Sequence, residues 1–440
     1  MLLASDTPAT EFDAVFVGGG LASLLCCLAL LEQQPRLRIA VVERGARLAG
    51  NHTWCFHAAD LPDEARSFVE PLIVQHWDGY AVRFPQRSRR LASAYACITS
   101  ERLHDVTRAR FESAAGSELL LGQSAERITP HSVLTTEGRL LRARLVVDAR
   151  GPMLDQARTA SDEQVANDGL GYQKFVGLEL RVAAHTLHEP VLFDATIPQH
   201  DGFRFMYTLP LAPDRVLVEE TFFSENARLD QAESYLSILA YARAQGFAVA
   251  EVLRSERGVL PMPWQDADFE PSARPLIAGY RAGLFHPVTG YSLPIAVRFA
   301  LALAACDFAQ LTERPEASSP LRDFARAHAA QRPFLRLLTR LMFTCFAPDQ
   351  RYSVLQHFYR LPEPVIERFY AAQLGALDRA RVFWGAPPRG FSVVRALRLS
   401  ALRARTKPAR AATPPTRAQE PGASTRHARA ETRTSTGAQS

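Results

Sequence analysis

A glycine-rich turn between two apolar segments constrains the fold of this chain more than any other stretch. The segment FDAVFVGGGLASLLCCLALLEQQPRLRIAVVERG, residues 12–45, predicts a strand at 13–17, a helix at about 22–34 and a second strand at 37–42. The first strand is almost wholly apolar, as is usual for a strand covered on both faces, and Pro35 ends the helix. The order strand, helix, strand predicts a βαβ unit and hence a parallel sheet.

The turn itself has the pattern of a dinucleotide site. It is formed by Gly18, Gly19, Gly20, Leu21 and Ala22. Ser23 stands at the third glycine position of GxGxxG, and Glu43 follows Gly20 by 23 residues, at the end of the second strand. Glycines let the backbone approach a pyrophosphate, the helix N-terminus faces its charge, and the acid accepts hydrogen bonds from ribose hydroxyls. FAD and NAD both fit this pattern, and a tight turn without a ligand is the alternative.

Two further stretches favour FAD. LVVDARG, residues 145–151, follows a β-meander at 118–147 and resembles the return strand of flavoprotein nucleotide domains, with Asp148 at its end. GLFHPVTGYSLP, residues 283–294, enters a helix expected at 293–309 and can present backbone N–H groups to a flavin ring or a pyrophosphate. The candidate contacts in this loop are Gly283, His286, Thr289 and Gly290. A lone histidine beside a proline is more often structural than a ligand.

The segment RVLVEETFFS, residues 215–224, predicts an apolar strand that carries two adjacent carboxylates, Glu219 and Glu220. Neighbouring side chains on a strand point to opposite faces, so one carboxylate is expected to face a core. The alternative is an exposed pair on an edge strand.

Length and charge limit the remaining possibilities. The 440 residues are too many for one small core, so two or three domains are expected. Residues 401–440 carry eight basic and two acidic side chains, which accounts for the whole of the net charge of +5. The body is therefore not basic, and no nucleic-acid partner is expected. Residues 404–440 lack periodicity and are expected to form a disordered basic tail.

No membrane span, disulfide or metal site is expected. Residues 14–31 carry no charge, but three glycines interrupt them and acidic residues precede them, which argues against a transmembrane helix or a signal peptide. The six cysteines form no CxxC motif and most lie in apolar runs, so buried thiols in a reducing compartment are expected. His52 and His57, like His185 and His188, lack a third ligand at metal spacing.

Taken together, seven motifs resemble the bacterial lycopene β-cyclase family and fall in the family's order. They are VGGGLAS, GNHTWCFH, GYQKFVGLEL, GFRFMYTLPL, VLVEET, GLFHPVTGYSLP and LPEPVIERFY. They cover about residues 12–390, and their combination is far more specific than any one of them.

This resemblance implies an α/β fold with two domains. The first is a Rossmann-type FAD-binding domain, the three-layer ββα flavoprotein fold, built from residues 1–70, 99–155 and 271–310. The second is a smaller substrate domain of antiparallel sheet and helices, built from residues 71–98, 156–270 and 311–390.

The resemblance also implies a chemistry. The family uses reduced FAD, with NAD(P)H as the electron donor, and converts the ψ end groups of lycopene to β-ionone rings without net redox change. Glu219 matches the first acid of the family's E-[ED]-T signature and is implied as the catalytic acid, with Glu220 as its outward neighbour. Gly18, Gly20, Glu43 and the loop at 283–291 match the FAD contacts. An alkene is a very poor base, and burial in an apolar pocket keeps such an acid protonated.

Because lycopene is a hydrocarbon of membranes, a cytoplasmic enzyme attached to the inner face of the membrane is expected. In RPFLRLLTRLMFTCF, residues 332–346, Arg332, Arg336 and Arg340 form one stripe beside apolar residues, as in an interfacial helix. A buried helix with an arginine edge is the alternative. Rival functions are an FAD-dependent monooxygenase or polyprenyl reductase, and a non-enzymatic carrier of prenyl lipids.

Overall fold

The computed structural model describes residues 10–152, 170–183, 185–264, 268–313, 318–385 and 387–392. All of these belong to one of the two units into which contacts divide the chain, residues 1–396. The expected tail at 404–440 lies outside the described residues.

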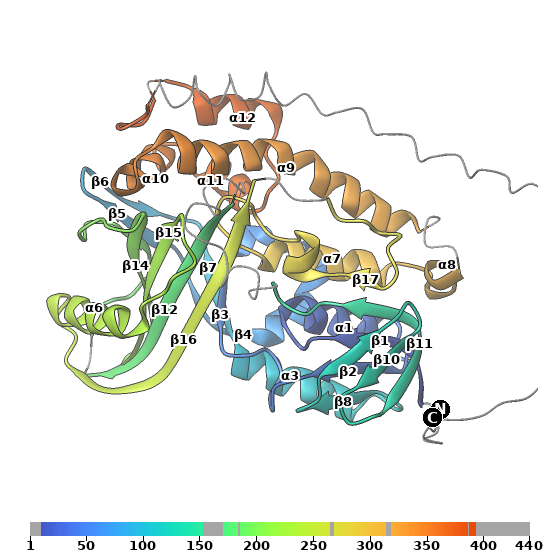
Figure 1. Cartoon of the computed structure of the whole chain (residues 1–440). Helices are drawn as coiled ribbons and strands as arrows, with labels where there is room; N and C mark the ends of the chain where they lie inside the picture. The colour runs from blue at the N-terminus through green and yellow to red at the C-terminus, as the bar shows by residue number, and fades with distance from the viewer. Residues whose placement is uncertain are drawn as a thin grey trace, which may run out of the picture. The chain divides into compact units, whose positions relative to one another are not determined.

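The first sheet carries the predicted βαβ unit (Figure 1). Its strands, in spatial order, are β8 (Glu118–Leu121), β2 (Ile39–Glu43), β1 (Thr10–Val17), β11 (Leu140–Asp148), β10 (Ser132–Thr135) and β9 (Ala125–Ile128), and β17 (Leu276–Ile277) also pairs with β11. β1 is parallel to both β2 and β11, whereas β10 and β9 turn back as the expected meander. The helix expected at 22–34 is α1 (Leu21–Gln33), and the strand expected at 37–42 is β2. Both predictions are confirmed to within two residues.

The second sheet is antiparallel apart from one strand pair. Its spatial order is β16 (Val249–Pro263), β12 (Leu170–Val182), β15 (Arg215–Ser224), β14 (Phe203–Ala212), β13 (Val191–Asp194), β5 (Tyr80–Phe84) and β6 (Arg87–Leu91). Only β13 and β5 run parallel. The predicted strand at 215–224 is β15, and it lies between β12 and β14. The alternative of an exposed pair of carboxylates on an edge strand is therefore excluded.

One face of the second sheet is covered by α6 (Gln231–Ala244), on the left of Figure 1. The Asp230 side chain accepts a hydrogen bond from the amide of Glu233 at 3.0 Å and so caps the start of the helix. Ile238 and Tyr241 of α6 pack with apolar side chains of β12 and β15, which form a separate core cluster. The sheet is thus buried on both faces, with its other face turned to the main core.

A third sheet and the remaining helices complete the described structure. The third sheet has the order β3 (Thr53–His57), β7 (Tyr95–Thr99) and β4 (Ile73–Trp77). The remaining α-helices are α2 (Arg66–Val69), α3 (Ser100–Glu112), α7 (Leu293–Ala304), α8 (Phe308–Glu313), α9 (Ser319–Cys345), α10 (Tyr352–Phe358), α11 (Glu363–Tyr370) and α12 (Ala376–Phe383). α7 packs on α1, and the long α9 contacts both α7 and β16, so it spans the two large sheets (Figure 1).

The helix expected at 293–309 is broken. α7 ends at Ala304, and α8 begins at Phe308 because the Asp307 carboxylate accepts hydrogen bonds from the amides of Ala309 and Gln310 at 2.9 and 3.1 Å. Such a side chain caps a new helix and ends the old one.

The interfacial helix predicted at 332–346 is wrong as a basic surface. Arg332 is 1% exposed, its Nε lies 3.1 Å from an Asp268 carboxylate oxygen, and its guanidinium also donates to the carbonyl of Gly283. Arg336 donates to the same carboxylate at 3.1 Å. The stripe turns toward these buried acceptors rather than toward solvent, since a neighbouring segment supplies both a carboxylate and a carbonyl. Among the described residues, no helix combines the length and apolar character needed to cross a bilayer.

Cysteine side chains follow the sequence expectation. All six are unpaired thiols, five of them buried, and Cys55 is partly exposed.

Candidate active site

A cavity of about 820 Å³ lies between the glycine turn of the first sheet and the inner face of the second sheet. At one end its walls come from residues 18–22, the end of β2 and residues 149–152. At the other end the lining is largely aromatic: Phe175, Phe193, Phe205, Tyr207 and Phe223. The cavity therefore joins a nucleotide-type turn to an apolar pocket.

The predicted turn residues face this cavity. Its lining includes Gly18, Gly19, Gly20, Leu21, Ala22 and Glu43. Gly20 is the N-cap of α1, and no side chain caps that end of the helix. A Cβ added at Gly20 would meet no atom within 4 Å, so the backbone is open to a ligand there. Because the free N–H groups and the dipole of a helix N-terminus favour an anion, these residues fit the pyrophosphate of a dinucleotide.

Two contacts fix the shape of the turn. Gly18 has φ +98°, and a Cβ on it would lie 2.9 Å from the carbonyl oxygen of Ala149, so a side chain does not fit. The Glu43 carboxylate accepts hydrogen bonds from the amides of Gly19 and Gly45, both at 2.7 Å. Each of its oxygens keeps a free lone pair. Glu43 can therefore orient the turn and also accept from ribose hydroxyls, a role that stays a prediction.

The loop at 283–294 contributes only part of what was predicted. Thr289 and Gly290 line the cavity, whereas Gly283 and His286 do not. His286 is fully buried, with Nε2 2.9 Å from the carbonyl oxygen of Phe369 and Nδ1 3.1 Å from the Thr289 hydroxyl. Burial lowers the pKa of His286 to about 3, so the ring is neutral and links the loop to α11.

Gly283 and Asp148 lie behind the lining. Gly283 has φ +67°, and a Cβ there would lie 2.5 Å from the Arg332 guanidinium, so only glycine allows this close packing. The buried Asp148 carboxylate ends β11 and pairs with Arg150 at 2.8 Å and Arg281 at 2.9 Å. Neither residue belongs to the cavity lining.

Glu219 faces the apolar end of the cavity, together with Thr221 and Phe223 of the same strand. These positions alternate along β15 and so share one face. The Thr221 hydroxyl donates to Glu219 Oε1 at 2.6 Å. Burial, and then the charge of the nearby Glu256, raises the pKa of Glu219 to about 8. The side chain is therefore largely protonated at neutral pH.

The prediction that Glu220 faces outward to solvent is wrong. Glu220 is 1% exposed, and its Oε1 accepts from Arg204 Nε at 2.7 Å and from the Ser237 hydroxyl at 2.8 Å. The physical reason is α6, which covers the face of the sheet opposite the cavity and supplies Ser237. Neighbouring carboxylates do point to opposite faces, but both faces are buried.

Aromatic rings at the same end were not recognised from the sequence. The hydroxyl oxygens of Tyr207, which is in register with Glu219, and Tyr95 lie 3.2 Å apart. The ring of His57 lies 5.1 Å from that of Tyr95 and 5.0 Å from that of Tyr370, and all of these residues line the cavity. Ring faces attract cations, so this wall suits a positively charged intermediate. The rings come from distant segments, and only the fold brings them together.

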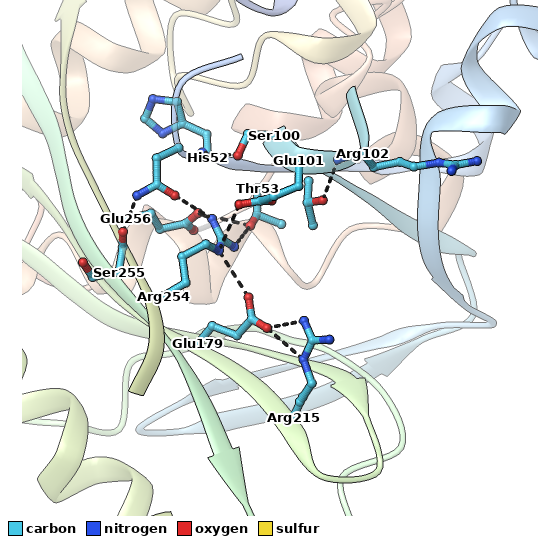
Figure 2. Close-up of polar contacts among 12 residues, drawn as sticks. His52, Thr53, Ser100, Glu101, Arg102, Glu179, Arg215, Arg254, Ser255 and Glu256 are labelled. Carbon is cyan, nitrogen blue, oxygen red and sulfur yellow. Dashed lines mark hydrogen bonds and ion pairs between the residues drawn. The ribbon is translucent and has the colours of Figure 1, made fainter. Parts of the chain in front are cut away.

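A second buried carboxylate beside Glu219 was also missed. Glu256 on β16 accepts a hydrogen bond from Arg254 Nη1 at 2.9 Å and from the Thr53 hydroxyl at 3.1 Å (Figure 2). Arg254 also donates to Glu179 at 3.2 Å. Glu256 is 37 residues from Glu219 in the chain, so only the strand register could have pointed to it.

Comparison with known proteins extends these observations. A sequence model described as "Lycopene cyclase protein" matches residues 13–433. The lycopene beta-cyclase of Pantoea ananas is 40% identical over 381 residues, covering 86% of this chain and 95% of that protein. The lycopene beta-cyclase of a Paracoccus species is 36% identical over 385 residues, covering 86% and 94%.

Solved structures share the fold at low identity. A geranylgeranyl bacteriochlorophyll reductase-like protein from Thermoplasma acidophilum matches with a TM-score of 0.57 and 12% identity, over 85% of this chain and 96% of its own. A probable FAD-dependent monooxygenase from Pseudomonas aeruginosa matches with a TM-score of 0.52 and 15% identity, over 85% and 99%. The predicted α/β fold of Rossmann type with a second, antiparallel part is confirmed. The exact domain boundaries stay a prediction.

Proposed function

Since the chain belongs to the lycopene cyclase family, we propose that it is a lycopene β-cyclase, an FAD-dependent enzyme that closes the ψ end groups of lycopene and related carotenoids to β-ionone rings. One observation carries this proposal beyond the family. Glu219 projects from a central strand into an aromatic cavity, where burial raises its pKa to about 8. A carboxylic acid that stays protonated at neutral pH inside an apolar pocket is what protonation of an alkene requires.

In the proposed reaction, Glu219 transfers its proton to C2 of the terminal double bond and leaves a tertiary cation at C1. The electron pair of the C5=C6 bond then attacks C1 and closes the ring, and a proton leaves C6. No atom is gained or lost. The phenylalanine and tyrosine side chains of the cavity exclude water, which would otherwise hydrate the cation, and their ring faces stabilise it.

The glycine turn, Glu43, Thr289 and Gly290 are proposed to hold FAD, since they line the cavity end that suits a pyrophosphate. When bound and reduced, FAD supplies negative charge near the developing cation without a net redox change. We assign the supply of electrons to NAD(P)H in the cytoplasm, which the six unpaired cysteines support.

The proposed enzyme works at the inner face of the membrane, where its hydrocarbon substrate lies. With Arg332 buried, the support moves from α9 to α12. Leu377, Phe383 and Trp384 are 75%, 53% and 82% exposed, and Arg381 is exposed beside them. An amphipathic helix with exposed leucine, phenylalanine and tryptophan next to basic side chains is typical of an interfacial anchor.

Liposome sedimentation tests this surface. Changing Leu377, Phe383 and Trp384 together to serine should weaken binding to anionic liposomes at least tenfold, because each such side chain contributes about 1.5–3 kcal/mol when fully buried. The matched control changes Tyr235 and Leu236 of α6, which are 38% and 68% exposed. Equal binding of the two variants would remove α12 from the proposal.

The activity test uses the purified, FAD-loaded protein with lycopene liposomes under anaerobic reduction, and products are identified by chromatography and mass. We expect cyclic carotenoids of unchanged mass, with no reductant consumed per ring. Glu219→Gln should lower the rate by more than about 10²-fold, because a positioned acid contributes about 10²–10⁴-fold. Glu251→Gln, an exposed glutamate of the same sheet, is the control. A product heavier by oxygen or hydrogen would support the rival redox enzymes, and unchanged lycopene would support a carrier.

A further inference from the structure

A glycine separates two buried carboxylates in one row across the second sheet. Gly177 on β12 is in register with Glu219 on one side and with Glu256 on the other. A Cβ added at Gly177 would lie 2.9 Å from Glu256 Cγ and 3.5 Å from Glu219 Cβ. The bare backbone at this position is therefore what lets both glutamate side chains lie over it.

The surroundings hold Glu256 as an anion. One of its carboxylate oxygens, Oε2, accepts from Arg254 Nη1 at 2.9 Å and from Thr53 Oγ1 at 3.1 Å, and the side chain is 2% exposed (Figure 2). The other oxygen, Oε1, would lie 3.2 Å from a Cβ at Gly177, over the glycine that separates it from Glu219. A guanidinium on one oxygen favours the charged form, while the second oxygen remains able to accept.

We propose that Glu256 is a positioning residue for the cyclisation: as a fixed anion beside Glu219, it keeps Glu219 protonated and adds negative charge to the wall that faces the carbocation. This inference rests on the proposed function for its link to the reaction. The underlying physics is general, because two neighbouring buried carboxyl groups do not both ionise at neutral pH and one of them retains a proton.

The other groups around the pair do not take this role. Tyr207 and Cys55, which line the same cavity, remain neutral because burial raises the pKa of each well above its ordinary value. Glu101 lies 3.9 Å from the Arg254 guanidinium and is half-exposed, and Glu179 lies two positions further along the sheet, in register with Arg254 and Leu217. Only Glu256 is an anion in register with Glu219 across the glycine.

The pair also fits the proton balance of the reaction. Each ring takes one proton at C2 and releases one at C6, so Glu219 must regain a proton in every turnover. A permanent negative charge beside it favours that return. The same charge attracts the cation, so part of the cost of removing the proton from Glu219 is offset while the cation exists.

Two measurements test the proposal, and one needs no activity. In infrared difference spectra of wild type against Glu219→Gln, the carbonyl band of the protonated Glu219 should disappear with a midpoint near pH 8. In Glu256→Gln, compared against the Glu219→Gln/Glu256→Gln double variant, the midpoint should fall by at least one pH unit. The alkaline limb of the pH–rate profile should shift by the same amount, which is tenfold in rate per unit. Glu179→Gln removes a carboxylate from the same arginine and should leave both midpoints unchanged.

Gly177→Ala gives a second route that keeps both carboxyl groups. Its Cβ would push the Glu256 side chain away, so the Glu219 midpoint should again fall. If Glu256→Gln and Gly177→Ala both leave the midpoint at its wild-type value, the proposal is overturned; lower flavin loading or stability without a shift would also leave Glu256 a structural role only. If the band shifts as expected but wild type forms no cyclic carotenoid, the carboxylate pair stands and the proposed function fails.

Discussion

Replacing Glu219 by glutamine should change how the free energy of unfolding depends on pH. The pKa of Glu219 rises from an ordinary value of 4.5 to about 8 in the folded protein, so the folded state binds the proton more tightly than the unfolded state. The stability that this proton contributes is fully present below pH 4.5 and is lost as the pH rises through about 8. Glutamine does not titrate. Relative to wild type, the variant should therefore gain stability between these two values and show a constant difference above them.

The shift sets the magnitude. One pKa unit corresponds to about 1.4 kcal/mol, so a change from 4.5 to about 8 gives an upper limit of about 5 kcal/mol. Glu219 is only partly buried, with its accessible surface turned to the cavity, and solvent there screens part of the effect. We expect the difference between variant and wild type to grow by about 1–3 kcal/mol across the interval.

Urea unfolding of the flavin-loaded proteins measures this difference. Both proteins are unfolded at half-unit steps between pH 4.5 and 9 at a fixed excess of FAD, and tryptophan fluorescence and circular dichroism are followed together. Glu251→Gln, on the exposed surface of the same sheet, is the control and should give a flat difference. A flat or falling difference for Glu219→Gln would refute the raised pKa, and with it the reasoning that the acid is stored in its protonated form.

Three further outcomes follow from single contacts. Glu220→Gln should cost about 3 kcal/mol of stability, because Arg204 loses the counter-charge of a buried pair; an unchanged urea midpoint would contradict this. Gly18→Val should abolish stoichiometric flavin, since φ is +98° and the new Cβ would lie 2.9 Å from a carbonyl oxygen, whereas normal flavin absorbance would exclude it. Gly20→Ala should keep the stability of the flavin-free protein, because its Cβ meets no atom within 4 Å, yet lower FAD affinity; unchanged affinity would move the pyrophosphate elsewhere.

Local rules predicted the nucleotide end of the site well. The apolar strand, the three glycines, the helix and Glu43 are neighbours in sequence, and each follows from a constraint that acts over a few residues. The predicted turn residues line the cavity as a group, and α1 begins within one residue of its predicted start. Asp148 and His286 were placed less well. A carboxylate or an imidazole near a glycine loop can point into the ligand site or pack behind it, and local sequence does not distinguish the two.

Predictions that depended on what covers a surface failed for one reason. The alternation of Glu219 and Glu220 was read correctly, but the outer face of β15 was assigned to solvent because the sequence alone does not show that α6 returns to cover it. Arg332 was assigned to a basic surface on the same grounds, and Asp268 and the carbonyl of Gly283 hold it in the interior instead. Charged side chains are buried when partners far away in the chain satisfy them, and the distance in sequence hides those partners.

The row formed by Glu219, Gly177 and Glu256 shows why the chemistry of this cavity cannot be read from one motif. Glycine weakens the interior of a strand, so its presence in β12 calls for a reason. The register supplies one: any side chain at position 177 would separate two carboxyl groups that lie on β15 and β16. The acid on VLVEET can be recognised alone, but its protonation depends on a glycine 42 residues before it and a glutamate 37 residues after it. Strand pairing, rather than any conserved spacing, creates the acid's environment.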